Sequence, residues 1–415
     1  MSAVAPPARG ALHPAAWFVL ILPFGALGGF VGVGLVFLAT RHGLSITEGA
    51  LLGGASLLSQ WLKWLWAPLV DVTLTPKRWY VMSALATAAG LVAMSAIPLG
   101  PSTLTLLLAV IALTSLLNTL TAMAVETTMA HATPPAAIGR AAGWLQAGNL
   151  GGSGLGGGLG LWLLESLPAP WMAGAAMGAL MLACCAVLPW VPDVPRHDHA
   201  QGGLGPAVRW VVRDWWASLR TRGGALSALL LVLPVGTGAA AGVLTQAAVA
   251  ARWGAGVAEV ALMQGVVAGL VTAAGCFAGG WICQRHAPRA TYAAIGLALA
   301  AVAAAFAIAP PTVATYVVGS LVYSFGVGIA YAAFTAVVLE AIGTGAAATK
   351  YTVLASLSNF PIWWLGLLLG WVADHHGAPA MLHTEAVLGV AGVAVFGLAS
   401  ALASRMARRG AFAAG

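Results

Sequence analysis

One stretch of the chain keeps a charge in a setting that otherwise suits hydrocarbon. The run SQWLKWLWAPLVD, residues 59–71, places Lys63 among three tryptophans and three leucines. A lysine near the centre of a lipid bilayer costs on the order of 3 kcal/mol, so a partner or a wet cavity must compensate it. Three roles are open for Lys63: attraction of an anionic group, a structural ion pair with another helix, or snorkelling to the surface.

The local pattern puts this lysine on a polar stripe. In a helix, Ser56, Gln60, Lys63 and Trp66 share one face. Lys63 precedes Asp71 by eight residues, which corresponds to about 12 Å of helical rise. Snorkelling over that distance is a long reach. We therefore expect Lys63 and its stripe to face a cavity or a carboxylate on another helix.

Further polar stripes run along other apolar segments. Gln146, Asn149 and Ser153 follow the i, i+3, i+7 spacing of one helical face. Polar side chains are costly against lipid, so such stripes face either a wet cavity or a neighbouring helix. The residues that we expect to line a binding cavity are Gln60, Lys63, Trp66, Asn118, Gln146, Asn149, Tyr316, Tyr323, Tyr331, Asn359 and Trp363.

Acids and bases also gather near the ends of apolar segments. Glu126 precedes Arg140 by 14 residues, and Glu340 precedes Lys350 by 10. We expect them, with Asp71, to form an ion-pair latch that closes one end of the helix bundle. The alternative is that these acids carry protons, since burial favours the neutral form of a carboxyl group.

The composition indicates that most of this chain lies in a lipid bilayer. Of its 415 residues, 60% are hydrophobic and 7% are charged, against about 25% charged in a soluble domain. Only lipid accommodates such a chain, and helices then satisfy every backbone amide. The sequence shows no nucleotide-binding loop, metal-ligand cluster or activated nucleophile. We therefore expect no enzyme, no cofactor and no metal.

The apolar runs predict an all-α polytopic membrane protein with twelve transmembrane helices in two six-helix bundles. The expected divisions are an N-terminal bundle over 1–191, a linker over 192–224 and a C-terminal bundle over 225–415. Within the linker, GPAVRWVVRDWWASLRTR is typical of an amphipathic helix at the membrane surface. The expected spans are 14–39, 46–70, 79–99, 103–130, 141–166, 169–191, 225–250, 257–283, 290–309, 312–341, 350–373 and 380–404.

The basic residues are distributed unevenly between the connecting segments. If the N-terminus is cytoplasmic, fifteen lysines and arginines lie on the inner side, and only Arg41 and Arg252 on the outer side. This positive-inside bias predicts cytoplasmic N- and C-termini, and the resemblance described below implies a bacterial inner membrane. It also accounts for the net charge of +7 without a nucleic-acid partner.

The two halves repeat one another. Arg41 matches Arg252 and Glu48 matches Glu259 at one offset of 211 residues, while Arg140 matches Lys350 and Asn149 matches Asn359 at 210. Halves of equal topology, each with six helices, are the arrangement of the major facilitator transporters.

A narrower resemblance starts at Lys63. KWLWAPLVD, residues 63–71, resembles the K-x-L-W-x-P-L-x-D run of the AmpG-like branch, and Asp71 with Lys77 and Arg78 resembles the loop signature of major facilitator transporters. Members of that branch include muropeptide permeases, acetyl-coenzyme A transporters and siderophore importers. The resemblance implies a monomeric importer of a polar, carboxylate-bearing solute, working by alternating access with protons as the coupling ion. Siderophore import and a non-transporting assembly factor of the same fold remain alternatives.

Small residues recur along the fifth expected helix. Spacing of four residues lets two helix backbones approach closely in lipid. We expect a sliding contact between the halves, with plain tight packing as the alternative. The glycines concerned are Gly148, Gly152, Gly156 and Gly160, facing Gly265 and Gly269 of the eighth helix.

Overall fold

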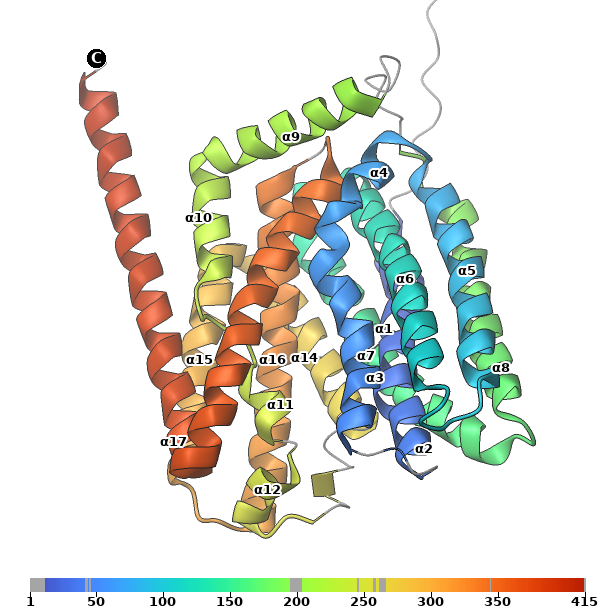
Figure 1. Cartoon of the computed structure of the whole chain (residues 1–415). Helices are drawn as coiled ribbons and strands as arrows, with labels where there is room; N and C mark the ends of the chain where they lie inside the picture. Colours follow the sequence, from blue (N-terminus) through green and yellow to red (C-terminus); the bar gives the residue numbers. More distant parts are fainter. Residues whose placement is uncertain are drawn as a thin grey trace, which may run out of the picture.

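The computed structural model describes residues 12–41, 44, 46–194, 204–244, 246–256, 259–260, 266–343 and 345–413. All regular structure in these ranges is helical. Figure 1 shows the long helices side by side, with α9, Leu204–Arg220, lying across one end of the bundle. We call this end the linker end and the opposite one the far end. A helix thus forms where the sequence predicts an amphipathic one.

The helices before α9 make up the first half of the protein. Several of them begin with proline. The N–H of the first helical residue makes no intrahelical hydrogen bond, so its absence in proline costs nothing there. These elements are α1 Ala15–Gly29, η1 Phe30–Leu35, α2 Val36–Arg41, α3 Ile46–Leu62, η2 Lys63–Leu65, α4 Ala67–Val72, α5 Pro76–Ala96, α6 Leu104–Ala132, η3 Pro135–Ala137, α7 Ile138–Ser166, α8 Pro170–Ala183 and η4 Cys184–Trp190.

The helices after α9 make up the second half. The last of them, α17, bends back at Gly377, whose φ of 83° and ψ of 167° are not helical, so it forms two arms. These elements are α10 Arg222–Val232, α11 Ala240–Leu244, α12 Ala247–Ala250, η6 Ala251–Trp253, α14 Val266–Arg285, α15 Pro288–Ile308, α16 Val313–Ile342 and α17 Ala347–Ala413.

Eight helices in the described ranges are long and apolar enough to cross a membrane. One of these eight is α17, which contributes two crossings because of its bend. Three further crossings are less apolar or interrupted. The first consists of α3 and α4, the second is α7, and the third consists of α10, α11 and α12. Within the described part of the chain, this gives the twelve helices of a polytopic all-α membrane protein.

Two of the crossings are broken within their length, although the sequence predicted both as unbroken spans. The first changes to a 3-10 turn at Lys63–Leu65, just before Pro68, which lacks an N–H for helical pairing. The second is interrupted between α10 and α11, where Pro234 is followed by Gly236 and Gly238 with φ of 61° and 68°. Broken helices expose backbone and side chains to the interior, where membrane transporters bind their ligands.

The glycines of α7 correct one of our expectations. A Cβ built on Gly148, Gly152 or Gly156 would collide with the backbone of α1, in the same half. Their i, i+4 row therefore packs within the first half and not against the second.

A different set of small residues forms the contact between the halves. A Cβ on Gly143 would lie 2.9 Å from Cα of Gly280 on α14, and one on Gly154 would lie 3.2 Å from Cα of Gly269. Gly265 lies outside the described residues. Because α7 carries glycines on two faces, its backbone approaches both α1 and α14 closely.

Alanine substitutions on α7 test this packing. Gly156→Ala should destabilise the protein by about 1–3 kcal/mol, because the new methyl group would overlap the backbone oxygen of Ala26. Gly151→Ala is the matched control, since its Cβ would meet only Cβ of Ala273 at 3.5 Å. Thermal unfolding in detergent measures both, and equal melting temperatures would contradict the packing.

Candidate functional site

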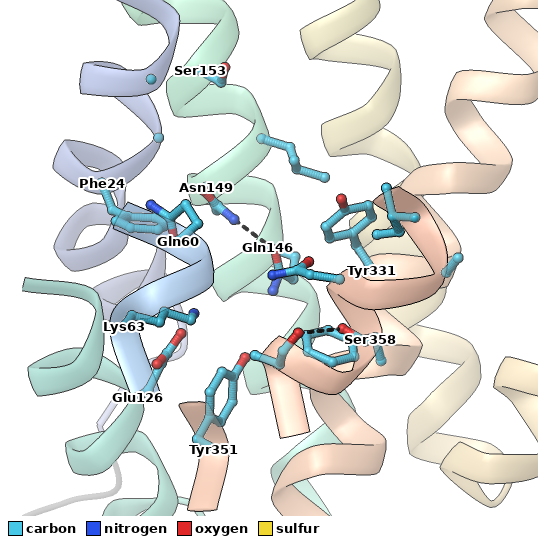
Figure 2. Close-up of a pocket in the computed structure, with 18 of the residues that line it drawn as sticks. Phe24, Gln60, Lys63, Glu126, Gln146, Asn149, Ser153, Tyr331, Tyr351 and Ser358 are labelled. Carbon is cyan, nitrogen blue, oxygen red and sulfur yellow. Dashed lines mark hydrogen bonds between the residues drawn. The ribbon is translucent and has the colours of Figure 1, made fainter. Parts of the chain in front are cut away.

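A cavity of about 450 Å³ lies between the two halves. Its walls come from α1, α3, η2, α6 and α7 of the first half, and from α15, α16, α17 and the break before α11 of the second. Figure 2 shows Lys63, Glu126 and Tyr351 at one end of this cavity and Ser153 at the other. Since α7 begins at the linker end, Lys63 and Glu126 occupy the part of the cavity nearer that end.

Lys63 and Glu126 are the charged groups among the residues that line the cavity. Each side chain is 6% exposed, and the two lie next to each other in Figure 2. Their opposite charges attract, yet no direct ion pair joins them among the contacts of the described residues. Oε2 of Glu126 is buried without a hydrogen-bond partner. The two opposite charges thus compensate each other, while Oε2 of Glu126 can still form a hydrogen bond with another group.

A chain of hydrogen bonds crosses from the first half to the second beside this pair. Asn149 Nδ2 donates to Gln146 Oε1 at 3.1 Å, and Gln146 Nε2 donates to Thr335 Oγ1 at 2.7 Å. The Thr335 hydroxyl lies 3.2 Å from the hydroxyl of Tyr351. Tyr351 and Glu126 both line this end of the cavity. Amides and hydroxyls of this kind can donate hydrogen bonds to a polar solute and accept hydrogen bonds from it.

The structure brings most of the expected binding residues together in the cavity. Asn118 is nearly buried, and its Nδ2 donates to the carbonyl of Phe24 at 3.2 Å. Trp363 remains about half exposed at the cavity wall. The expected residues that line the cavity are Gln60, Lys63, Asn118, Gln146, Asn149, Tyr331, Asn359 and Trp363.

Three expected residues lie elsewhere, and each makes a packing contact instead. Trp66 Nε1 donates to Thr119 Oγ1 at 2.9 Å within the first half. The Tyr316 hydroxyl donates to the carbonyl of Leu244 at 2.9 Å. The Tyr323 hydroxyl donates to Glu385 Oε1 at 2.6 Å. We therefore remove Trp66, Tyr316 and Tyr323 from the candidate binding set.

The linker end of the cavity is closed by contacts between the halves. Asp71 Oδ1 accepts from the backbone N–H of Ala348 at 3.0 Å, and its Oδ2 accepts from the N–H of Thr349 at 2.9 Å and the hydroxyl of Thr349 at 2.7 Å. A carboxylate from the first half thus caps the N-terminus of α17. An apolar cluster lies beside this cap and includes Ala67, Met123 and Ala348.

The other residues of the expected latch have different partners. Lys350 pairs with Asp214 of α9 at 3.0 Å, and Asp214 also accepts from the N–H of Ala346 at 2.9 Å. Glu340 pairs at 3.0 Å with Arg289, a residue of its own half.

Two further latch residues are not where we expected them. Arg140 is exposed and forms no ion pair within the described ranges. Glu126 faces the cavity and not the bundle end, because α6 continues six residues beyond it to Ala132. The latch is therefore corrected to a helix cap made by Asp71 and a linker contact made by Lys350.

Sequence reasoning missed Tyr351 and Ser358, which also line the cavity. A signal was available in the expected residue Asn359. Tyr351, Ser358 and Asn359 share one helical face at i, i+7 and i+8. Extending the stripe of Asn359 toward the start of its helix would have found both residues.

Comparisons with known proteins agree with this architecture. A sequence model described as Major Facilitator Superfamily matches residues 16–362. The human organic anion transporter MFSD10 is 19% identical with a TM-score of 0.69, covering 94% of this chain and 100% of that chain. The E. coli fucose:proton symporter FucP is 16% identical with a TM-score of 0.70, covering 94% and 98%. The proton:xylose symporter XylE is 14% identical with a TM-score of 0.62, covering 91% and 94%.

At these identities the solved structures show a shared fold and nothing about the solute. No curated protein sequence matches the chain.

The compensation between Lys63 and Glu126 can be tested by a double-mutant cycle. Lys63→Met should destabilise the protein by about 3–5 kcal/mol, because it leaves a buried carboxylate without its opposite charge. Lys63→Met combined with Glu126→Gln should recover most of that loss. Thermal unfolding of the purified variants at neutral pH measures the coupling. Additive losses in the double variant would show that the two charges do not compensate each other.

The cap on α17 can be tested with a reporter cysteine. We expect Asp71→Ala to weaken the closed linker end by about 0.5–2 kcal/mol, the typical cost of losing a helix cap. The reporter Met123→Cys, in a chain whose four native cysteines are replaced by alanine, should then react faster with a maleimide. Asp193→Ala is the control, because Asp193 is exposed and pairs with Lys77 at 2.8 Å. Equal labelling rates in the two variants would exclude Asp71 from the closure.

Proposed function

Because the chain belongs to the Major Facilitator Superfamily, a family of transporters and not of enzymes, we propose that it imports a polar, carboxylate-bearing organic solute by alternating access. The observation that carries this proposal is the pair of Lys63 and Glu126 inside a cavity shared by both halves. Lys63 supplies an ammonium for an anionic group, and the amides and hydroxyls around it supply hydrogen bonds.

The same pair supports coupling to protons. In the empty state, the ammonium of Lys63 and the carboxylate of Glu126 compensate each other. When Glu126 takes up a proton, Lys63 is free to pair with the carboxylate of the solute. The cavity holds the same net charge in both states, so neither leaves an uncompensated charge in low dielectric. Proton and solute therefore bind together and are released together.

The direction of transport follows from the orientation that we propose. The positive-inside bias supports a cytoplasmic linker end, with both termini cytoplasmic in a bacterial inner membrane. In the state described here, the cap by Asp71 separates the cavity from that side. A proton arriving from the acidic outer side would load Glu126, and its release into the cytoplasm would discharge the solute.

The chemical class of the solute rests on resemblance as well as geometry. The run from Lys63 to Asp71 resembles the AmpG-like branch, which supports a muropeptide-like solute, with an iron-loaded siderophore as the alternative. A cavity of about 450 Å³ falls within the range of small-molecule sites. We expect a single copy of the chain to perform transport, because each half contributes walls to the same cavity.

Uptake into proteoliposomes tests the proposal. The panel contains an anhydromuropeptide, an iron-loaded siderophore and a neutral sugar as control. For one proton carried with one monoanion, an inward gradient of one pH unit should give about tenfold accumulation of the solute, since that gradient corresponds to about 1.4 kcal/mol. The membrane potential alone should drive none, because the combined charge is zero.

Glu126→Gln should abolish this pH-driven accumulation, because the glutamine cannot exchange a proton. Glu165→Gln is the matched control, since Glu165 lies at the exposed end of α7, away from the cavity. Accumulation that persists in Glu126→Gln would exclude Glu126 as the proton carrier. The absence of uptake for every member of the panel would favour the assembly-factor alternative.

A further inference from the structure

A second cavity, of about 570 Å³, lies at the linker end on the side of the bundle. We call it the lateral groove. Its walls come from η2 and α4 of the first half, from α9, and from the first arm of α17. Figure 1 shows the start of α17 beside α4, beneath α9. The wall residues are largely apolar and include Trp64, Leu65, Val212, Trp215, Leu357 and Phe360.

The lateral groove opens toward the hydrocarbon of the bilayer. Trp64 and Phe360 are each about half exposed, and Leu65 is 54% exposed. Large apolar side chains on the outside of a membrane-spanning bundle contact lipid and not water. A molecule that fills this groove therefore enters from the membrane and carries an apolar chain.

Two polar atoms in the groove wall have no partner in the protein. Nε1 of Trp215 and Oγ of Ser356 are both buried without a hydrogen bond. The indole N–H is a donor only, whereas the serine hydroxyl can donate or accept. Buried donors of this kind are normally satisfied. An ester carbonyl can accept from either group once its side chain turns toward the groove, whereas an unsubstituted hydrocarbon offers no acceptor.

The helix that roofs the groove carries positive charge at its water-facing side. Arg209, Arg213 and Arg220 are exposed on α9, next to the exposed apolar residues Val212 and Trp216. The guanidinium of Arg220 lies 5.5 Å from the ring of Trp216. Such a surface matches an anionic headgroup above an apolar tail.

We propose that the lateral groove binds one acyl chain of an anionic phospholipid, with its ester at Trp215 and Ser356 and its phosphate against the arginines of α9. The groove is formed jointly by both halves and the linker helix. Occupation therefore stabilises the arrangement in which the linker end is closed. This inference does not depend on the identity of the transported solute.

Photocrosslinking of the whole protein in nanodiscs tests the proposal. One set of nanodiscs contains phosphatidylglycerol and the other phosphatidylcholine with the same acyl chains, each with a trace of the matching lipid that carries a diazirine in its chain. Mass spectrometry then locates the adducts. We expect them to be enriched in the segments 64–68 and 353–360 over the exposed control position Leu367, and only with phosphatidylglycerol.

Two variants separate the headgroup from the groove. Arg209→Gln with Arg213→Gln should lower the phosphatidylglycerol adducts by roughly 25-fold, since each basic residue near an anionic lipid contributes about fivefold to affinity. These side chains are exposed, so folding is not at risk. Ser356→Phe should fill the groove and remove its adducts while leaving those at Leu367.

The opposing results are equally defined. Equal adduct yields with the two lipids would overturn the role of the headgroup. If the adduct yield in the lateral groove is no higher than that at Leu367, the groove makes only the ordinary lipid contact of an exposed surface. Adducts that survive Ser356→Phe would place the lipid outside the groove. Each of these results contradicts the proposal.

Discussion

An ammonium group within a membrane-spanning bundle needs an opposite charge or a water-filled cavity to compensate it. Lys63 satisfies this requirement through Glu126, which comes from another helix of the same half. The helix that carries Lys63 changes to a 3-10 turn at that residue, so the side chain is presented to the interior. The glycines of α7 let it pack closely against α1 in its own half and against α14 of the other half. The helix break and the cavity thus place one compensated charge between the two halves.

The two halves share a topology but divide the chemistry. Asn149 and Asn359 occupy equivalent positions and both reach the cavity, as expected from the internal repeat. The charges, however, belong to the first half, whereas the second half contributes the hydroxyls of Tyr331 and Tyr351. The first half thus supplies both charges and several amides, and the second half adds hydroxyls, so the cavity is chemically asymmetric although the halves share a topology.

Hydropathy predicts the crossings because lipid imposes one length and one composition on every helix. Spacing along single helices identified the stripe of Gln60 and Lys63, since that information is local. Sequence reasoning failed where a partner lies far along the chain. The hydroxyl of Tyr323, for instance, is satisfied by Glu385, which no local pattern connects to it. Likewise, the depth of Glu126 depends on where α6 ends, and a helix end is less sharply encoded than a helix interior.

The closure at the linker end uses a different kind of contact from the cavity, and the difference has a physical reason. Asp71 bonds mainly to backbone N–H groups at the start of α17. When such a contact separates, water can solvate both the carboxylate and the N–H groups, so each hydrogen bond to the carboxylate costs only about 1.5–3 kcal/mol net. Lys63 and Glu126 are each only 6% exposed, so their separation would leave buried charge without compensation. The alternating access that we propose therefore requires contacts that break easily at the ends and a charge balance that is preserved in the cavity.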